Sequence, residues 1–425
     1  MGAIAGSLQT SERKSLRLLI LSSSFPRFIG DLQGHFIYEL AVRLNRNNCV
    51  TVLCPRAERT MEVESLNGLS VFRFSYFYPV RIQQLSQDGG MAHNFKQSLF
   101  AKIQVPFFLL SELFYTAVII RKLQVEMINS HWLAPQGLVA AVCHKIFGVK
   151  HILTVHSSEV TLIQKVPFGR SIANFTLRHS DAIVSVSEHR AQELLDFVDP
   201  MLRQEVYGKL RVVPMGVNIP KVQGDLNKDN LRSKYAINTK HVILFVGRLI
   251  EVKGCEYLIR AMAKLTQNKA DVLLIVVGSG PLEKQLMSIA RQNDLESSVR
   301  FVGAVDHSLI PEYFTLADIV VVPSIVDSSG FQEGLPVVLL EGMSYGKAVI
   351  GTETKGILEI ITDGSNGLIV KPQNVIELEQ KIRMLIDDNE LLQKISENAR
   401  KSAEAYGWPV IIERYASIIG SINLQ

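Results

Sequence analysis

Apolar and polar positions follow a repeating order along the chain, in which short apolar runs alternate with segments of helical spacing. The apolar runs of the front half are residues 17–21, 49–54, 71–77, 127–131, 150–155, 180–187 and 210–218. After the polar residues 219–239 the order restarts, with runs at 241–249, 271–277, 299–303, 319–323 and 348–351. Short apolar runs that alternate with helices are typical of parallel βαβ units. The restart predicts two successive α/β sheets with a cleft between them.

The length of the chain also indicates two domains. Its 425 residues exceed what one ordinary hydrophobic core accommodates. We expect a polar tail at residues 1–15, a first α/β domain at 16–219, a second at 220–405 and a final segment at 406–425. The first 14 residues lack the apolar core of a signal peptide, and the four cysteines form no C-x2-C pair. We therefore expect a reducing, cytoplasmic location with neither a disulfide framework nor a zinc site.

Charge is distributed unevenly between the two halves. Residues 1–218 contain 23 Lys and Arg against 16 Asp and Glu (+7), whereas residues 219–425 contain 22 against 25 (−3). The basic front half indicates an anionic partner or a membrane surface, or simply a solvated basic surface, and we expect no nucleic-acid partner. Residues 105–120 are the most membrane-like stretch, but they are short for a span and contain Pro106 and Glu112. We interpret them as a packed helix, with peripheral contact at the inner membrane face as the alternative.

The segment at residues 328–347 carries the most distinctive chemistry. Glu333 lies in a loop before a predicted helix that Pro336 would begin, and Glu341 follows eight residues later on that helix. A carboxylate beside the free amides of a helix N-terminus suits a polyhydroxy ligand that carries negative charge, and Gly334 allows a close approach. The alternative is that Glu333 caps the helix and Glu341 is a paired or solvated surface residue.

Three further residues are candidates for the same cleft. Arg248 leaves the tip of a predicted strand and Lys253 stands at the start of the next helix, so that a planar fork and a point charge could converge on a diphosphate. The alternative is two exposed basic residues on a loop. His156 follows another strand, at the edge where α/β sheets bind ligands, and it could be a ligand contact or a structural residue. The loop at 22–34 reaches the same edge but lacks G-x-G-x-x-G, which counts against a dinucleotide-binding dehydrogenase.

Taken together, these motifs resemble the retaining glycosyltransferases of family 4, whose GT-B fold consists of two facing Rossmann-like domains. The resemblance covers nearly the whole chain. Its motifs are N-S-H-W at 129–132, P-Q-G at 135–137, T-V-H at 154–156, V-G-R-L-I-E-V-K-G at 246–254, V-G-S-G-P-L at 277–282 and Q-E-G-L-P-V-V-L-L-E at 332–341. The last of these is the E-x7-E signature. The sequence departs from the family at Asp31-Leu32, where a glycine pair is usual, at Glu159, where Asp is usual, and at Lys355, where Gly is usual.

The resemblance implies a role for each candidate. The implied donor-binding residues are Gly34, Arg248, Lys253, Val305, Asp306, Glu333, Gly334, Leu335, Pro336 and Glu341, and the implied catalytic residues are His156, Arg248, Lys253 and Glu333. Arg248 and Lys253 would bind the diphosphate, Glu333 the sugar hydroxyls and Glu341 the ribose hydroxyls, while His156 would lie beside the sugar and the acceptor. Gly34 would let the first loop approach the phosphates, and residues 305–306 would contact the nucleobase. The first domain would bind the acceptor and the second the donor, with the final segment crossing back to the first.

The implied reaction is transfer of a hexosyl group from a nucleotide-diphosphate sugar to a hydroxyl of a glycan or lipid-linked acceptor, with retained configuration. Such a reaction would serve surface polysaccharide (including lipopolysaccharide) or glycolipid assembly. No carboxylate is clearly placed as a nucleophile, so we expect no glycosidase-like double displacement. No Asp-x-Asp motif lies in a suitable loop, so we expect neither a metal nor another cofactor. A sugar-nucleotide epimerase of the same architecture and a non-catalytic binding protein for a nucleotide sugar or glycan remain open. The sequence does not decide between UDP, GDP and ADP.

Overall fold

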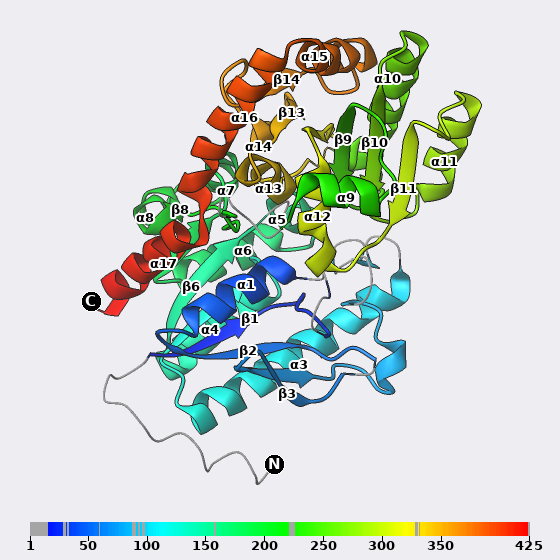
Figure 1. Ribbon diagram of the computed structural model, residues 1–425. Helices are drawn as coiled ribbons and strands as arrows, with labels where there is room; N and C mark the ends of the chain where they lie inside the picture. Colours follow the sequence, from blue (N-terminus) through cyan, green and yellow to red (C-terminus); the bar gives the residue numbers. More distant parts are fainter. Residues whose placement is uncertain are drawn as a thin grey trace.

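The computed structural model of the chain describes residues 16–28, 31, 34–58, 60–86, 91, 94–95, 98–156, 159–220, 226–327, 330 and 332–423. It contains two α/β domains, each built on a sheet whose strands are almost all parallel (Figure 1). This confirms the fold class predicted from the alternating pattern.

The N-terminal domain contains the larger sheet, in the order β3-β4-β2-β1-β5-β6-β7-β8. Its strands are β1 (Arg17–Leu21), β2 (Cys49–Pro55), β3 (Val63–Leu66), β4 (Leu69–Phe74), β5 (Met127–His131), β6 (Lys150–Val155), β7 (Ala182–Ser185) and β8 (Leu210–Val212). Its helices are α1 (His35–Leu44), α3 (Leu99–Leu123), α4 (Gln136–Phe147), α5 (Glu159–Ile163), α6 (Gly169–Arg178), α7 (Glu188–Phe197) and α8 (Arg203–Lys209), with the 3-10 turn η1 (Val80–Ile82). Only the β3–β4 pair is antiparallel. The carboxyl ends of the other strands therefore meet at one edge of the sheet.

The C-terminal domain repeats this design with the strand order β11-β10-β9-β12-β13-β14. Its strands are β9 (His241–Val246), β10 (Val272–Val277), β11 (Val299–Gly303), β12 (Ile319–Val322), β13 (Ala348–Thr352) and β14 (Leu368–Val370). Its helices are α9 (Lys228–Lys234), α10 (Cys255–Gln267), α11 (Glu283–Gln292), α12 (Ile310–Leu316), α13 (Val337–Ser344), α14 (Lys355–Leu358), α15 (Val375–Asp387) and α16 (Asn389–Ala403), with the 3-10 turns η2 (Glu251–Lys253), η3 (His307–Leu309) and η4 (Glu404–Tyr406). Every strand pair in this sheet is parallel.

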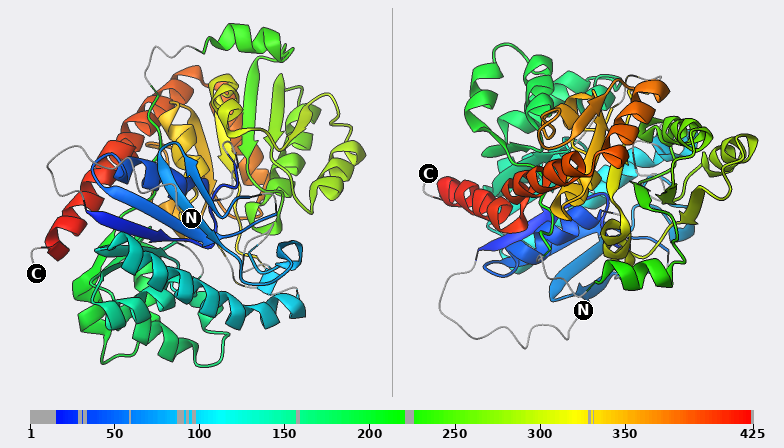
Figure 2. Two further views of the ribbon diagram at one scale, coloured as in Figure 1. Left: turned by 90° about the horizontal axis from the view of Figure 1, so that it is seen from below. Right: turned by 45° about the horizontal axis from the view of Figure 1, so that its top comes forward.

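Helices cover both faces of each sheet, which explains why the strands are apolar throughout instead of alternating. Strand β10 is buried at every position, and its side chains enter two separate cores, one under α10 and α15 and the other under α12 and α13. The last helix, α17 (Trp408–Asn423), lies against the N-terminal domain, where Trp408 and Tyr415 enter the core beside α1. Both views in Figure 2 show this red helix running along the blue part of the molecule.

Glycines allow the loops at the strand ends to approach one another closely. Gly34 precedes α1 with a left-handed backbone, and a Cβ at this position would lie 2.2 Å from the carbonyl oxygen of Ser24. Gly254 precedes α10 with φ +63°, and a Cβ there would lie 1.9 Å from the carbonyl oxygen of Pro323. The second contact brings the loop after β9, which carries Arg248 and Lys253, against the loop after β12.

The structure differs from the sequence prediction in several elements. Helix α3 is 25 residues long, begins at Leu99 and includes Pro106, so it extends beyond the predicted residues 105–120 at both ends. By length and composition this helix could cross a membrane, so the prediction from residues 105–120 alone underestimated it. Strand β8 is shorter than the apolar run 210–218 predicts, and α9 lies inside the polar residues 219–239, where no element was predicted. Short or polar elements such as β8 and α9 carry little periodic signal.

Candidate active site

The donor-side residues of the C-terminal domain gather where β9 and β12 end. The ammonium of Lys253 forms an ion pair with one carboxylate oxygen of Glu333, and the Ser324 hydroxyl donates a hydrogen bond to the other. The Thr352 hydroxyl donates to the backbone carbonyl of Ser324. The loops after β9 and β12 therefore fix the position of one carboxylate, and the end of β13 in turn holds the backbone of Ser324. Two carboxylate oxygens offer about four acceptor sites, so Glu333 can still accept hydrogen bonds from ligand hydroxyls.

The Lys253–Glu333 pair was not predicted as a pair, although each residue was a candidate. Their side chains are 20% and 15% exposed, which leaves both accessible to a ligand from the cleft. Arg248 lies close by in sequence but is exposed, and it has no ion-pair partner among the described residues. The loop after β9 thus presents one guanidinium with no ion-pair partner among the described residues and one ammonium that is already balanced by Glu333.

Glu341 lies on α13, behind the Glu333 loop. Burial raises the pKa of its carboxyl to about 7, and the nearby charge of Lys253 opposes this shift. The helix begins at Val337, and Pro336 is its extended N-cap residue, one position earlier in the motif than the first-turn place predicted for it. Gly334 is buried and Leu335 half-buried. The E-x7-E spacing therefore places one carboxylate in the loop and the other half-buried on the helix that follows.

The N-terminal side of the cleft is neutral and aromatic. His156, at the end of β6, hydrogen-bonds through Nε2 to Nδ1 of His131 at 2.7 Å, and the two rings are stacked with centroids 5.0 Å apart. The rings of Trp132 and Phe36 lie 5.4 and 5.0 Å from that of His156. Burial lowers the pKa of His156 to about 3 and that of His131 well below its ordinary value. Both imidazoles are therefore neutral at physiological pH.

The backbone of His156 is held as well as its ring. Its N–H donates to Oε1 of Glu159 at 2.7 Å, so the glutamate that replaces the usual Asp makes a specific contact with the cleft histidine. The side chain of His131 is fully buried, and its Nε2 has no hydrogen-bond partner among the described residues. The N-S-H-W motif contains His131, but sequence reasoning gave this residue no role. The feature that could have identified His131 is its place at the end of β5, because β5 pairs with β6, the strand that leads to His156.

The remaining donor candidates lie where the two domains approach each other. The ring of His35, next to Gly34, lies 3.8 Å from that of His307, next to Asp306. Asp306 is exposed, and the N–H and hydroxyl of Ser308 donate to its carboxylate, which lowers its pKa. Val305 is half-buried nearby. These residues are thus brought together with Gly34 and His35, but no hydrogen bond or ion pair within the described part of the chain joins any of them to the Lys253–Glu333 pair.

Comparison with known proteins places the chain in a family. A model of glycosyl transferases group 1 matches residues 227–402, and a model of glycosyltransferase family 4 matches residues 33–220. The chain belongs to glycosyltransferase family 4. It is 25% identical to an uncharacterised glycosyltransferase of Methanocaldococcus jannaschii over 92% of this chain and 95% of that protein. It is 23% identical to N-acetyl-alpha-D-glucosaminyl L-malate synthase of Bacillus anthracis, over 85% and 90% of the two chains.

Solved structures show the same fold as this glycosyltransferase. Sucrose-phosphate synthase from Thermosynechococcus elongatus superposes with a TM-score of 0.73 at 19% identity, covering 96% of this chain and 99% of that one. Anabaena HepE in complex with UDP-glucose superposes with a TM-score of 0.70 at 18% identity, covering 96% and 100%. The two facing α/β domains are therefore the GT-B fold.

Contacts between the two domains of the glycosyltransferase lie beside the loop that carries Glu333. Arg190 on α7 is buried and donates from Nη2 to the carbonyl oxygen of Gln332 at 2.7 Å. The carboxylate of Glu359, at the end of α14, accepts the backbone N–H groups of Glu188 (2.8 Å) and His189 (2.7 Å). A carboxylate of one domain thus caps the helix N-terminus of the other. Sequence reasoning missed both contacts, since they join residues 142 and about 170 positions apart.

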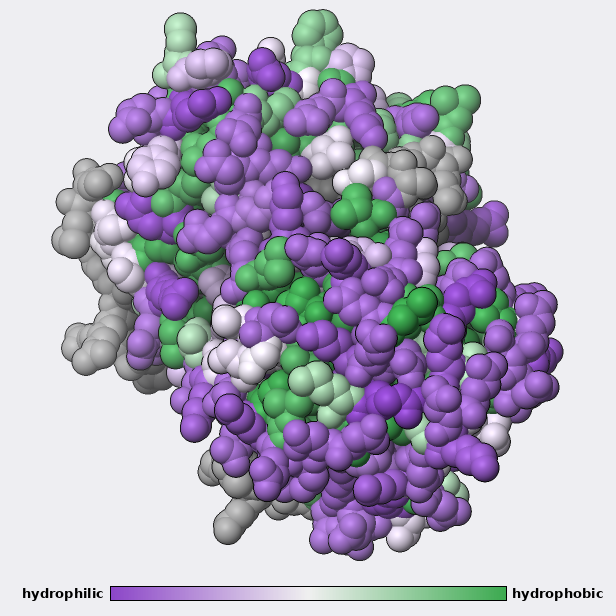
Figure 3. All heavy atoms as spheres, turned by 90° about the horizontal axis from the view of Figure 1, so that it is seen from above, coloured by the Kyte–Doolittle hydropathy of each residue, from purple (hydrophilic) through white to green (hydrophobic). Residues whose placement is uncertain are grey.

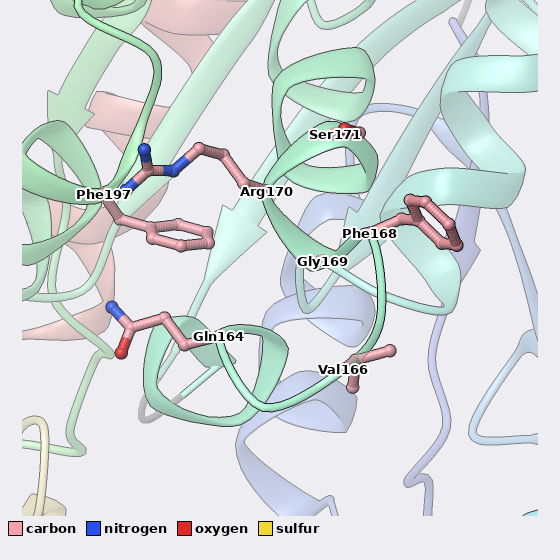
Figure 4. A pocket seen from close by; sticks show the side chains of 7 residues that line it. All are labelled: Gln164, Val166, Phe168, Gly169, Arg170, Ser171 and Phe197. Atoms are coloured by element: carbon pink, nitrogen blue, oxygen red, sulfur yellow. The ribbon is translucent and has the colours of Figure 1, made fainter.

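A cavity of about 370 Å³ lies away from these residues, in the N-terminal domain of the glycosyltransferase (Figure 4). It is lined by Gln164, Val166, Phe168, Gly169, Arg170, Ser171 and Phe197. The guanidinium of Arg170 lies 5.5 Å from the centroid of the Phe197 ring, whereas Phe168 points away from that ring. None of the predicted site residues lines this cavity.

Proposed function

We propose that this family 4 glycosyltransferase transfers a hexosyl group from a nucleotide-diphosphate sugar to a hydroxyl of a glycan or lipid-linked acceptor, with retained configuration and without a metal. The observation that carries the proposal is the Lys253–Glu333–Ser324 cluster. A fixed carboxylate suits the sugar hydroxyls, and two adjacent cationic side chains suit the diphosphate. Anabaena HepE has been crystallised with UDP-glucose, which supports a nucleotide-sugar donor for a chain of the same fold.

The way in which Glu333 is held argues against a double displacement through this carboxylate. A nucleophilic carboxylate must point one oxygen at the sugar carbon, as in retaining glycosidases. Here the oxygens of Glu333 already accept from Lys253 and Ser324, which favours a role in binding sugar hydroxyls. The departing diphosphate would then take the acceptor proton, and Arg248 and Lys253 would stabilise its developing charge. Closure of the cleft at Arg190 and Glu359 would hold the reacting groups in place.

The acceptor side supports a sugar or lipid-linked hydroxyl more than a charged acceptor. Trp132 and Phe36 surround His156, and both histidines are neutral. Aromatic rings stack well on sugars and other flat apolar faces. We propose that the protein acts in surface polysaccharide or glycolipid assembly at the cytoplasmic side of the membrane.

Donor binding is the first test. Purified protein is heated with UDP-, GDP- or ADP-sugars in the presence of a chelator, and its unfolding temperature is recorded. A ligand at about a hundred times its Kd adds about 2.7 kcal/mol of stability. We expect a shift with one nucleotide class, followed by transfer to an acceptor whose new bond has the donor's anomeric configuration. Absence of a shift with every donor would contradict the proposal. Product formed from donor alone would identify an epimerase.

Arg248→Ala tests the diphosphate assignment. Because Arg248 is exposed and has no ion-pair partner in the described part of the chain, its removal is expected to leave stability unchanged. We expect a loss of about 10² in kcat/KM from the missing electrostatic stabilisation. Arg291→Ala, an exposed arginine on α11, is the matched control. Equal activity of the two variants would exclude Arg248 from the site.

A further inference from the structure

Helix α3 exposes a continuous apolar face that the transfer reaction does not explain. Its large apolar side chains recur at spacings of three or four residues, so they lie on one side of the helix. Tyr78 adjoins them, because the ring of the preceding Phe77 packs on that of Phe107 at 5.3 Å. We define the α3 face as Tyr78, Leu99, Ile103, Phe107, Leu110 and Phe114. Their exposed fractions run from 50% for Phe107 to 87% for Tyr78. Contiguous exposed apolar side chains of this size mark an interaction surface.

The opposite side of α3 fixes the helix to its domain. Phe108 packs on the rings of Phe74 and Tyr76, with centroids 5.1 and 5.0 Å away. The side chain of Gln104 accepts the N–H of Gln84 at 2.9 Å and donates to the carbonyl of Ile82 at 2.8 Å. A helix held in this way cannot leave the domain to span a bilayer. It can lie in the plane of a membrane surface with its apolar side chains among the lipids.

The charges around this face are cationic. Arg81, which follows Tyr78 by three residues, and Lys102 on the first turn of α3 are exposed, as are Arg121 and Lys122 in its last turn. Glu112, the one acidic residue of α3, is fully buried and bonded to Gln136. Exposed cations beside an apolar helix face attract anionic lipid headgroups. A second copy docked through the same face would bring two sets of these cations together, which disfavours self-association. By contrast, the face of the molecule seen in Figure 3 is mostly hydrophilic.

The position of the face relates it to the cleft. Helix α3 connects β4 to β5, and these strands run in the same direction because the pairs β4–β2, β2–β1 and β1–β5 are all parallel. The helix therefore runs back antiparallel to them, and its first half lies at the carboxyl ends of the strands (Figure 1). That edge carries Trp132 and His156. The α3 face as defined ends at Phe114, so it occupies the first part of the helix, which is nearer the edge that carries Trp132 and His156.

We infer that the α3 face docks on the surface of an anionic lipid bilayer and brings the acceptor side of the cleft to lipid-linked substrates. The second part of this inference rests on the proposed transferase function, whereas membrane docking does not. The apolar side chains supply the insertion and the surrounding cations supply the preference for anionic headgroups.

Vesicle sedimentation with the full chain tests the docking. The probes are vesicles of phosphatidylcholine alone and vesicles that also contain phosphatidylglycerol. We expect binding to the anionic vesicles that weakens with added salt, and a loss of about tenfold or more in the triple variant Ile103→Gln/Phe107→Gln/Leu110→Gln. The matched control is Ile376→Gln/Met384→Gln, since both residues are exposed apolar side chains on α15 of the other domain. The unfolding temperatures of all proteins check that the exposed substitutions leave the fold intact.

Each result bears on the inference. Wild-type protein that stays in solution with anionic vesicles, or a triple variant that sediments as wild type does, would overturn it. A dimer in solution that the triple variant abolishes would identify a second copy as the occupant and overturn it as well. Transfer to a soluble acceptor is measured separately without vesicles. Protein that binds vesicles but transfers no sugar would support the docking and contradict the proposed function.

Discussion

The two sides of the cleft differ in how their polar groups are stabilised. On the C-terminal side, Lys253 and Glu333 are half-buried ions that balance each other. On the N-terminal side, His131 and His156 are buried, stacked and neutral. In the proposed reaction, negative charge develops on the diphosphate and positive charge on the sugar carbon. Cations near the diphosphate lower the barrier, whereas an imidazolium near the sugar carbon would raise it. The comparison teaches that burial can serve catalysis by keeping the imidazoles of His131 and His156 uncharged beside the sugar.

Glu333→Gln breaks the charged side and is expected to have the largest effect. The amide keeps the shape of the side chain, but it loses the charge that pairs with Lys253 and one acceptor for sugar hydroxyls. We expect kcat/KM to fall by about 10³, since the position of the sugar and the charge balance both change. Initial rates over a range of donor concentrations measure this. Glu390→Gln, an exposed residue at the start of α16, is the control. A rate within about twofold of wild type would remove Glu333 from the site.

His131→Phe breaks the neutral side. The variant keeps an aromatic ring but leaves Nε2 of His156 without its partner at 2.7 Å. We expect kcat to fall by about tenfold with the donor KM little changed, because in the proposed site His131 would position His156 and would not contact the donor. His131→Asn, which can restore a hydrogen bond to His156, is expected to recover part of the rate. Equal rates for the Phe and Asn variants would show that only packing matters.

The same variant has a pH signature. In the folded protein the pKa of His131 lies well below 6.5, so the unfolded chain binds a proton at this residue as pH falls below about 6.5 while the folded chain does not. Stability is therefore fully present above that pH and is lost on acidification, by about 1 kcal/mol per pH unit for each such histidine. Urea unfolding from about pH 7 to about pH 5 measures the slope. We expect a shallower slope for His131→Phe, and an unchanged slope would contradict the buried neutral state.

Glu341 lies on the same side of the cleft as the Lys253–Glu333 pair, but burial favours the neutral form of its carboxyl, as burial does for the two histidines on the other side. Its pKa of about 7 means that the carboxyl ionises within the physiological range. An ionised carboxylate accepts hydrogen bonds from ribose hydroxyls better than the neutral acid. We expect donor affinity to rise several-fold between about pH 6 and about pH 8 in wild type and to stay level in Glu341→Gln. Calorimetry with the intact nucleotide sugar, whose diphosphate does not titrate in this range, provides the test. If the donor affinities of wild type and Glu341→Gln change with pH in the same way, Glu341 does not bind the ribose hydroxyls.

The sequence predicts the charged side better than the neutral side for a physical reason. Glu333 and Glu341 belong to one loop and helix, so their spacing is local and can be read directly from the chain. Arg248 and Lys253 are likewise near neighbours. The histidine pair depends on the pairing of β5 with β6, and nothing in the 25-residue separation indicates it. The strands themselves were predictable because both sheet faces are covered, which makes their sequences uniformly apolar.

Glu359→Gln tests whether the two sides depend on each other, and we expect it to have the smallest effect. The carboxylate accepts two backbone N–H groups at the start of α7, whereas a glutamine amide can accept at only one of its two ends. A charge at a helix N-terminus contributes about 0.3–1 kcal/mol, so the domain contact should weaken and the donor KM should rise by about threefold. Glu188→Gln, in the first turn of the same helix, removes an equal charge but keeps the backbone N–H groups that Glu359 accepts. If both variants raise KM equally, the effect is helix capping alone. If only Glu359→Gln raises KM, the contact between the domains contributes to donor binding. In that case the same contact would bring His131 and His156 to the sugar and order the loop that carries Glu333.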